Sequence, residues 1–171
     1  MNAEQETEQS TALQGLQDRA EIGEVIDRYA EGIRRRDVSL VTSCFSESAA
    51  IDHGPGRQIA GSEAIREYFA RSFNPDTETG EQAAEQRAIS TPVMSNLQIQ
   101  LAGDTAHCES MCLAIHVSLL EGDAAVTVRG TRNVDDLVRT SEGWKIQARR
   151  HPALWMFKVP GTLLANPSEI I

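Results

Sequence analysis

Apolar residues recur three and four positions apart in the early part of the chain. The residues with this spacing are Ile22, Val25, Ile26, Tyr29 and Ile33. This spacing gives a helix one apolar face, because an α-helix turns once in about 3.6 residues. We therefore predict a long amphipathic helix that ends near Arg36. The polar, acidic residues 1–10 precede it, and we expect them to form a disordered tail.

A second helix and a first strand are predicted next. Asp37 can cap a helix over residues 38–45, because its carboxylate can accept hydrogen bonds from the free amides of the first turn. The strand over residues 49–52 is short and partly β-branched, and a Gly-Pro-Gly turn stops it. This strand therefore ends on a titratable pair, Asp52 and His53.

A third helix and a loop complete the first half of the chain. Ser62 is the expected N-cap of this helix, which carries Ile65, Tyr68 and Phe69 on one face. Residues 74–86 contain turn residues and no apolar period. They therefore form either a lid or a plain flexible loop.

From about residue 88 onward the pattern changes to alternation, which is typical of strands joined by short turns. The predicted strands are one that ends before 103–104, followed by 106–120, 124–138 and 144–151. Three helices followed by antiparallel strands form an α+β pattern. We predict one domain over residues 11–157, in which a curved antiparallel sheet wraps around the long helix and encloses a cone-shaped cavity. The tail over 158–171 is either a pocket cover or a dimer arm.

The strand over residues 106–120 has one strongly apolar face. Its apolar residues are Met111, Leu113, Ile115, Val117 and Leu119. The opposite face carries small residues and His116. The apolar face is larger than contacts with the helices require, so we expect a second copy of the chain to cover part of the sheet in a symmetric dimer.

Composition narrows the class of protein. A chain of 171 residues fits one domain, and its net charge of −9 disfavours both nucleic acid and an anionic membrane surface. Cys44, Cys108 and Cys112 are odd in number and have no C-x-x-C spacing, which favours small buried residues in a reducing compartment. The first residues do not resemble a signal peptide, and no apolar run reaches membrane length. We therefore expect a cytoplasmic protein.

Several of these segments together resemble a known superfamily. Tyr29, the helix that ends in Phe45, the strand AAIDHG and the later GSEAIREYF are similar to the nuclear transport factor two-like superfamily. The nearest members by motif are its SnoaL-like polyketide cyclases and ketosteroid isomerases, and the resemblance covers about residues 18–155. It implies the cone-shaped fold with a hydrophobic pocket. It does not fix the reaction, because the superfamily includes isomerases, dehydratases, cyclases, dehydrochlorinases and proteins without chemistry.

The resemblance implies roles for three residues. Tyr29 falls where the ketosteroid isomerases carry the tyrosine of their oxyanion hole, and Asp135 resembles their second oxyanion donor, a protonated carboxylic acid. His53 falls where they carry an aspartate base, and a neutral imidazole can abstract a proton near pH 7. Structural readings stay open: an apolar helix face for Tyr29, a surface position for His53, and a salt bridge or cap for Asp135.

Arg149 is the fourth catalytic candidate. It matches an arginine of the SnoaL-like dehydratases and dehydrochlorinases that lies five residues after a tryptophan, here Trp144. Arg149 and His151 should point to the same face of their strand. They either line one wall of the cavity, where a guanidinium can stabilise an anion, or lie on the outer surface of an edge strand.

The Asp-His dyad of the dehydratase-type members is missing. Their aspartate lies five residues after the tyrosine, where this chain has Arg34. Their histidine lies four residues before an asparagine, and counting back from Asn96 gives Pro92. A proline can neither accept nor donate a proton, so elimination of that type requires His53, His116 or His151 as the base.

We also expect Asn96, His116, His151 and Trp155 to bind the substrate. No ligand spacing indicates a metal and no glycine-rich phosphate loop is present, so we expect no metal and no cofactor. Two functions stay open. One is a cofactor-independent isomerase, cyclase or lyase that acts on a hydrophobic polycyclic carbonyl or phenolic molecule through an enolate. The other is a non-catalytic small-molecule-binding or assembly protein that keeps the fold.

Overall fold

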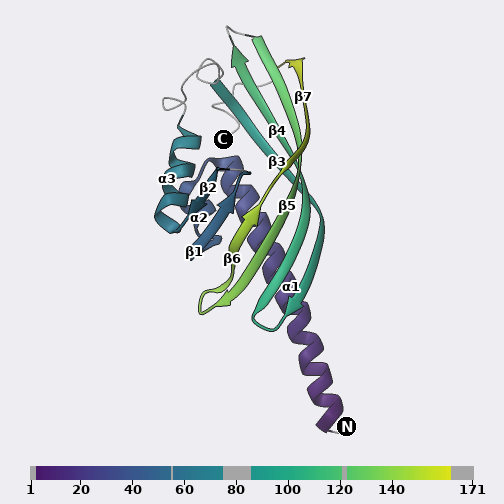
Figure 1. The fold of residues 1–171 in the computed structure, drawn as a ribbon. Coiled ribbons are helices and arrows are strands. Elements are labelled where there is room, and N and C mark those ends of the chain that lie inside the picture. The colour runs from purple at the N-terminus through teal and green to yellow at the C-terminus, as the bar shows by residue number, and fades with distance from the viewer. Residues whose placement is uncertain (1–2, 55, 75–85, 121–122, 163–171) are drawn as a thin grey trace.

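The computed structural model describes residues 3–54, 56–74, 86–120 and 123–162 (Figure 1). Its helices are α1 (Ala3–Arg35), α2 (Val38–Thr42) and α3 (Ser62–Phe73), and its strands are β1 (Phe45–Asp52), β2 (Gln58–Ala60), β3 (Gln86–Ala102), β4 (Thr105–Leu120), β5 (Asp123–Thr140), β6 (Gly143–Arg150) and β7 (Ala153–Gly161). A curved sheet lies against the long helix α1, with α2 and α3 beside its N-terminal strands (Figure 1). The α+β architecture expected from the sequence is confirmed.

The sheet is mixed and does not close into a barrel. Its strand order is β2-β1-β6-β5-β4-β3, and β7 pairs with β5 off this path. All pairs are antiparallel except β1 with β6, which run parallel. The sequence predicted an antiparallel sheet throughout. One pair is parallel because the chain passes from β2 at one edge of the sheet to β3 at the other edge, and returns through β4 and β5 before β6 lies beside β1. β5 pairs with β7 up to Thr131 and with β6 from Val134 onward.

The core lies between α1, the inner face of the sheet and the two short helices. Its buried apolar residues are Ile22, Val25 and Ile26 from α1, Val41, Cys44, Phe45, Ala49 and Ile51 from α2 through β1, Ile65 and Phe69 from α3, and Ala106, Cys108, Leu137, Trp144 and Ile146 from the long strands. Full burial of a large aliphatic side chain stabilises a fold by about 1.5–3 kcal/mol. The apolar stripe predicted for the first helix is therefore confirmed as the face that the sheet covers.

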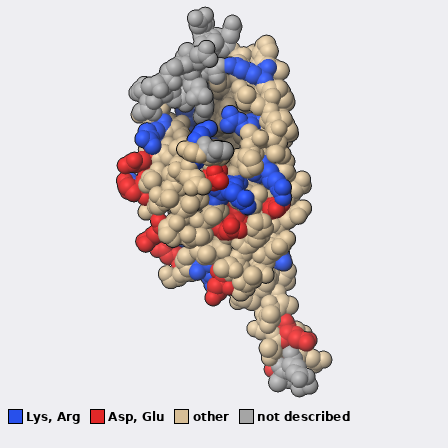
Figure 2. All heavy atoms as spheres, in the orientation of Figure 1, with Lys and Arg blue, Asp and Glu red and all other residues tan. Residues whose placement is uncertain are grey.

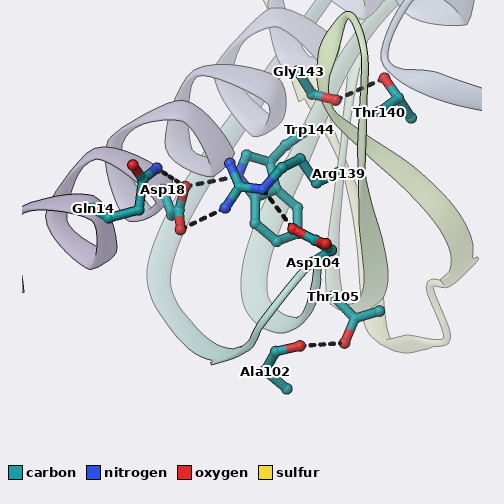
Figure 3. Close-up of polar contacts among 9 residues, drawn as sticks. All are labelled: Gln14, Asp18, Ala102, Asp104, Thr105, Arg139, Thr140, Gly143 and Trp144. Atoms are coloured by element: carbon teal, nitrogen blue, oxygen red, sulfur yellow. Dashed lines mark hydrogen bonds and ion pairs between the residues drawn. The ribbon is translucent and has the colours of Figure 1, made fainter. Parts of the chain in front are cut away.

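A group of polar contacts also holds α1 against the strands (Figure 3). Asp18 is only 5% exposed. It accepts hydrogen bonds from Gln14 Nε2 (3.0 Å) and Trp144 Nε1 (3.3 Å), and its other oxygen lies 2.7 Å from Arg139 Nη2. Arg139 also contacts Asp104 at 3.0 Å and lies 4.6 Å above the Trp144 ring. We call these five residues the Asp18 cluster; they join α1, β5, β6 and the β3–β4 turn.

Two helix ends differ from the sequence expectation. α1 already begins at Ala3, because Ala, Glu and Gln favour helix and a residue added to an existing helix needs no new nucleation. α2 is capped by Asp37, whose Oδ1 accepts from Leu40 N at 2.9 Å, but it ends at Thr42 rather than near residue 45. Residue 45 instead begins β1.

The start of α3 also differs. Gly61 is the N-cap, with φ of 87°, and no side chain caps the helix. Glycine suits this position because a positive φ carries no Cβ penalty there. The expected cap, Ser62, is the first helical residue. Most of the loop predicted over 74–86 lies outside the described residues, as do residues 163–171 of the predicted tail.

Strand β7 is absent from the sequence-based assignment. It pairs with β5 from Ala124↔Gly161 to Thr131↔Ala153. Trp155 lies on Gly130, where a Cβ atom would come within 2.3 Å of the indole ring. Residues 158–161 therefore belong to a strand rather than to a tail. β7 packs mainly through backbone pairing and shows no alternation of burial along its length.

The outer face of the sheet, which points away from α1, carries several exposed apolar side chains. Val93, Leu113, Trp155, Phe157 and Val159 are each between 39% and 49% exposed. The register places Val93, Leu113, Gly130 and Trp155 in one row across four strands. Within the described residues, none of the helices combines the length and apolar character needed to cross a membrane.

Candidate active site

A buried ion pair forms the base of the candidate site. Arg149 on β6 and Asp135 on β5 are direct partners in the register of these antiparallel strands. The guanidinium donates from Nε and Nη2 to the two carboxylate oxygens, at 2.6 and 2.7 Å, and both side chains are at most 1% exposed. Burial alone lowers the pKa of Arg149, but the Asp135 carboxylate outweighs this and raises it above its ordinary value.

This pairing changes the interpretation of two residues. Arg149 does not lie on the outer surface of an edge strand; it points into the core. Asp135 forms the salt bridge that the sequence analysis left open as its alternative role. A two-point contact with a guanidinium favours a carboxylate over the protonated acid implied by the isomerase resemblance.

Tyr29 lies on the other side of the guanidinium. The central carbon of Arg149 lies 4.0 Å from the centre of the Tyr29 ring, which is a cation–π contact. The ring also meets Phe45 and Phe69 edge to face, at 6.0 and 6.3 Å. Burial raises the pKa of Tyr29, although Arg149 opposes the shift, so the phenol stays protonated at neutral pH.

Arg149 keeps one nitrogen free for further contacts. Its Nη1 atom is buried and has no hydrogen-bond partner within the described part of the chain. A buried cationic donor without a partner is unfavourable unless a ligand or water satisfies it. The arrangement of Tyr29 and Arg149 therefore offers a phenol and a guanidinium N–H side by side.

Two histidines from distant parts of the chain meet next to this pair. His151 Nε2 and His53 Nδ1 lie 2.7 Å apart, and the ring centres are 4.3 Å apart. The Tyr68 ring covers His53 at 4.8 Å. The strand end places His53 in a tight turn, where its amide donates to Arg57 O at 3.1 Å. The side chain of Asp52 accepts instead from the Gly54 amide and lines a groove with Arg150.

Both histidines are neutral near pH 7. Burial lowers the pKa of His53, and the nearby Arg57 lowers it further. Burial also lowers the pKa of His151 to about 3, with added contributions from His53, Arg149, Arg129 and Arg57. A hydrogen bond between two neutral imidazoles requires one ring to donate and the other to accept.

One of the two tautomer arrangements creates a base. If His53 Nδ1–H donates to His151 Nε2, then His53 Nε2 carries a lone pair. This Nε2 atom is buried and has no hydrogen-bond partner among the described residues. A neutral imidazole with a free lone pair and a supporting acceptor behind it is suited to accept a proton.

The structure does not bring the other predicted binding residues to this group. His116 Nδ1 lies 3.1 Å from Ser90 Oγ, farther along the inner face of β4. Asn96 is exposed, with a φ of 54°, in the irregular part of β3 between Ser95 and Gln98. Trp155 lies on the outer face and stacks on Phe157 with ring centres 6.0 Å apart.

The structure also places the two positions of the missing dyad. Arg34 faces solvent and binds Glu31 at 2.7 Å. Pro92 is the register partner of Ala114 on β3 and β4. Neither position supplies a proton-transfer group to the His53–His151 pair.

The sequence analysis missed the contribution of Tyr68, Arg57 and Arg129 to the site. Tyr68 was assigned to an apolar helix face, and its phenol was the available signal. The two arginines carried no sequence signal, because only the folded chain brings them near the histidines: Arg57 through the turn after β1, and Arg129 through its place on β5, which pairs with β6.

The cysteines lie near the site, and burial favours their protonated thiol form. Cys44, Cys108 and Cys112 are free and buried, as expected. Burial raises the pKa of each thiol, that of Cys108 to about 11. Among the described residues no group of three His, Cys, Asp or Glu side chains is placed to hold a metal ion.

Comparison with known proteins identifies the family. Residues 14–150 match the SnoaL-like domain. The chain belongs to the SnoaL-like domain family. A search of the curated proteins finds no match.

Solved structures show the same fold. A hexachlorocyclohexane dehydrochlorinase (LinA, type 2) has a TM-score of 0.73 at 14% identity, with 91% of this chain and 98% of that chain covered. A protein assigned as a scytalone dehydratase from Novosphingobium aromaticivorans has a TM-score of 0.65 at 16% identity, with 92% and 95% covered. An NTF2-like protein with a cystatin-like fold from the same species has a TM-score of 0.67 at 20% identity, with 86% and 89% covered. At these identities the likeness shows the fold alone.

Proposed function

We propose that this chain is a cofactor-independent isomerase, cyclase or lyase that acts on a hydrophobic polycyclic carbonyl or phenolic molecule through an enolate. The observation that carries the proposal is the His53–His151 contact, which leaves the buried Nε2 atom of His53 without a partner; His151 follows β6, the strand that carries Arg149. Among the solved structures of this fold, one is named as a dehydrochlorinase and another is assigned as a dehydratase. Both names describe eliminations, which supports reactions of this type without fixing which one occurs here.

The first step is proton transfer from carbon. His53 Nε2 accepts a proton from the carbon next to the carbonyl group, and the electron pair of the broken C–H bond moves to the carbonyl oxygen. The Tyr29 hydroxyl donates a hydrogen bond to this developing enolate oxygen, and the guanidinium of Arg149 supplies positive charge. His151 accepts from the Nδ1–H of the imidazolium that forms, so it positions and stabilises the base.

The enolate then has three outcomes. Return of the proton from His53 to a different carbon gives isomerisation. Attack of the enolate carbon on an internal carbonyl gives cyclisation, and expulsion of a leaving group from the next carbon gives elimination. The choice depends on the substrate, and all three share the same base and oxyanion donors.

The experiment is exchange of α-protons for deuterium on a panel of cyclic and polycyclic ketones, measured by NMR. We expect His53→Gln to reduce the exchange rate by about 10²–10⁴-fold, which is the usual contribution of a general base. We expect Tyr29→Phe to reduce it by about 10²-fold, as for loss of one oxyanion donor. His107→Gln is the matched control, because His107 lies at the surface beside Asp136.

A non-catalytic binding protein is the second candidate. Its support is the absence of the family's Asp-His dyad, since Arg34 faces solvent and position 92 is a proline. Tight binding of a ketone without exchange in the wild type would favour this candidate. Exchange that survives His53→Gln would instead assign the base to another residue.

A further inference from the structure

The inner face of the sheet carries positive charge, although the chain as a whole is strongly acidic. Among the inner-face residues of β3, β4, β5 and β7 that lie within 86–119 and 124–161, Asp135 is the only carboxylate, and Arg149 already binds both of its oxygens. The net charge of the protein is −9. An inner face without a free acid is therefore not a consequence of composition.

Arginines from two separate elements surround the histidine pair. Arg57 follows the turn that holds His53, and its amide donates to Gly54 O at 3.0 Å. Arg129 shares the inner face of β5 with Asp135, and its Nη2 atom contacts Met156 Sδ at 3.9 Å. Both side chains are exposed, so they lie at the rim of the site rather than in the core. Their positive charge reaches His151 and contributes to its low pKa.

The charge pattern is visible on the molecular surface. In Figure 2, Lys and Arg side chains lie in the upper part of the described body, whereas in the middle of this face they are interspersed with Asp and Glu, and further Asp and Glu side chains lie along the edge of α3 and towards the N-terminus of α1. Lys158 adds to this arrangement, because its register partner Thr127 lies on the inner face of β5. The site thus has cations at its rim and, deeper inside, the buried and unpartnered Nη1 nitrogen of Arg149.

We propose that the site takes substrates that carry an anionic group, a carboxylate or a phenolate, which Arg149 Nη1 receives and which Arg57 and Arg129 attract at the rim. The inference rests on the proposed function, since it names the class of substrate for the same site. The two neutral histidines add no negative charge that would repel such a group. The rim cations also give an anionic substrate a favourable approach to a protein whose net charge would otherwise repel it.

The anionic group also suits the proton transfer. An anion next to His53 favours the imidazolium that forms when Nε2 accepts the proton. The cations offset the second negative charge that appears on the enolate oxygen. A neutral substrate of the same shape lacks the first of these contributions.

The test is binding of a matched pair of probes to the full chain, measured by calorimetry at low salt. The probes are 2-naphthoate and its neutral methyl ester, which share the ring system. We expect the wild type to bind the carboxylate about tenfold or more tightly than the ester, with an affinity that falls as salt is added. We expect Arg57→Gln and Arg129→Gln each to weaken carboxylate binding by about threefold to tenfold and to leave ester binding unchanged.

Arg132→Gln is the matched control for Arg129→Gln. Arg132 lies three residues away on the same strand, on the outer face, where it binds Glu109. The substitution Arg132→Gln removes the same charge from the protein without changing the site, so carboxylate binding should stay within about twofold of the wild type.

Three results would overturn the proposal: equal affinity for acid and ester, an equal effect of Arg132→Gln and Arg129→Gln, or no binding of either probe at millimolar concentration. The outcome is independent of the exchange assay. Selective carboxylate binding, with no exchange on ketones that carry a carboxylate, would contradict the proposed reaction but support the substrate class. Exchange on neutral ketones, with no preference for 2-naphthoate over its ester, would support the proposed reaction but contradict the substrate class.

Discussion

At the residue scale Arg149 has one structural role and one proposed role, and mutating it cannot separate the two. Its Nε and Nη2 atoms neutralise Asp135 in the core, while Nη1 stays free for a ligand. Removal of one partner of a buried ion pair typically destabilises a protein by about 3–5 kcal/mol, because the other charge stays buried alone. An inactive Arg149 variant would therefore not distinguish a folding role from a binding role, and Arg57 and Arg129 are the informative positions.

The histidine pair predicts how stability depends on pH. The pKa of folded His151 is about 3, whereas an unfolded histidine titrates near 6.5. Below pH 6.5 the unfolded chain binds a proton that the folded chain excludes. The free energy of unfolding should therefore fall with decreasing pH, by up to about 1.4 kcal/mol per pH unit for this one group. Urea unfolding of the wild type and of His151→Asn between pH 7.5 and 5 measures the effect, and the variant should show a shallower slope.

His107 provides a control of opposite sign. Its Nδ1 atom lies 2.7 Å from Asp136 Oδ1 on the protein surface, and this contact raises its pKa. A raised pKa contributes stability at low pH that is lost as the pH rises. His107→Asn should therefore steepen the loss of stability on acidification rather than flatten it. Identical slopes for wild type and His151→Asn would mean that His151 is protonated in the folded protein.

Single residues of the site were predictable from the sequence, but their contacts were not. Tyr29 and Arg149 were found by family resemblance, and alternation along the strand placed Arg149 and His151 on one face. The contact between His53 and His151 spans 98 positions in the chain. It depends on the parallel pairing of β1 with β6, which no local pattern indicates.

At the scale of elements, the Asp18 cluster determines how α1 sits on the sheet. Only part of α1 carries the apolar stripe, and its N-terminal turns extend beyond the strands (Figure 1). Asp18 is the point where the helix meets β5 and β6 through Arg139 and Trp144. Burial by itself raises the pKa of Asp18, but its hydrogen bonds to Arg139, Gln14 and Trp144 outweigh burial and lower it.

We expect Asp18→Asn to lower the free energy of unfolding by about 1–3 kcal/mol at pH 7. The neutral amide cannot form an ion pair with the guanidinium of Arg139, and its NH₂ group would face donors. The measurement is urea unfolding, with Glu21→Gln as the control, because Glu21 is an exposed acid on the same helix. Equal stability of Asp18→Asn and the wild type would show that the cluster does not hold α1 in place.

Elements with a strong period were predicted well, and those without one were not. α1 and β4 have clear helical and strand spacing, so their type was correct and only their ends moved. β7 was missed because nearly all of its residues are exposed, and its sequence therefore lacks the alternation that marks a half-buried strand. The turn between α2 and β1 was misplaced by three residues, because Phe45 is buried in either assignment.

At the scale of the whole molecule, the two faces of the sheet have opposite character. The inner face carries the site with its small, polar and cationic residues. The outer face carries apolar rows on β3, β4, β5 and β7 that remain 39–49% exposed at their largest side chains. Large contiguous apolar surfaces of this kind are rare on monomers and favour an interface.

We therefore expect the chain to form a symmetric dimer through this outer face. Light scattering at micromolar concentration should give twice the 18.7 kDa of one chain. Leu113→Glu and Phe157→Glu should each shift the mass towards that of the monomer, because a charge in an apolar interface is desolvated without a partner. Leu16→Glu is the matched control, since Leu16 is 66% exposed on α1, away from the sheet face.

A monomer mass for the wild type would contradict the dimer, and so would a dimer that survives both sheet substitutions but not Leu16→Glu. The first result would leave Trp155 and Phe157 as an exposed stack that covers only their own strand and Gly130. The second would place the interface on the projecting part of α1. Either way the inner-face site would be unaffected, because Arg149, His53 and Tyr29 all come from one chain and lie on the opposite side of the sheet. Exchange activity should therefore persist in any sheet-face variant that stays folded, which separates assembly from chemistry in the same set of proteins.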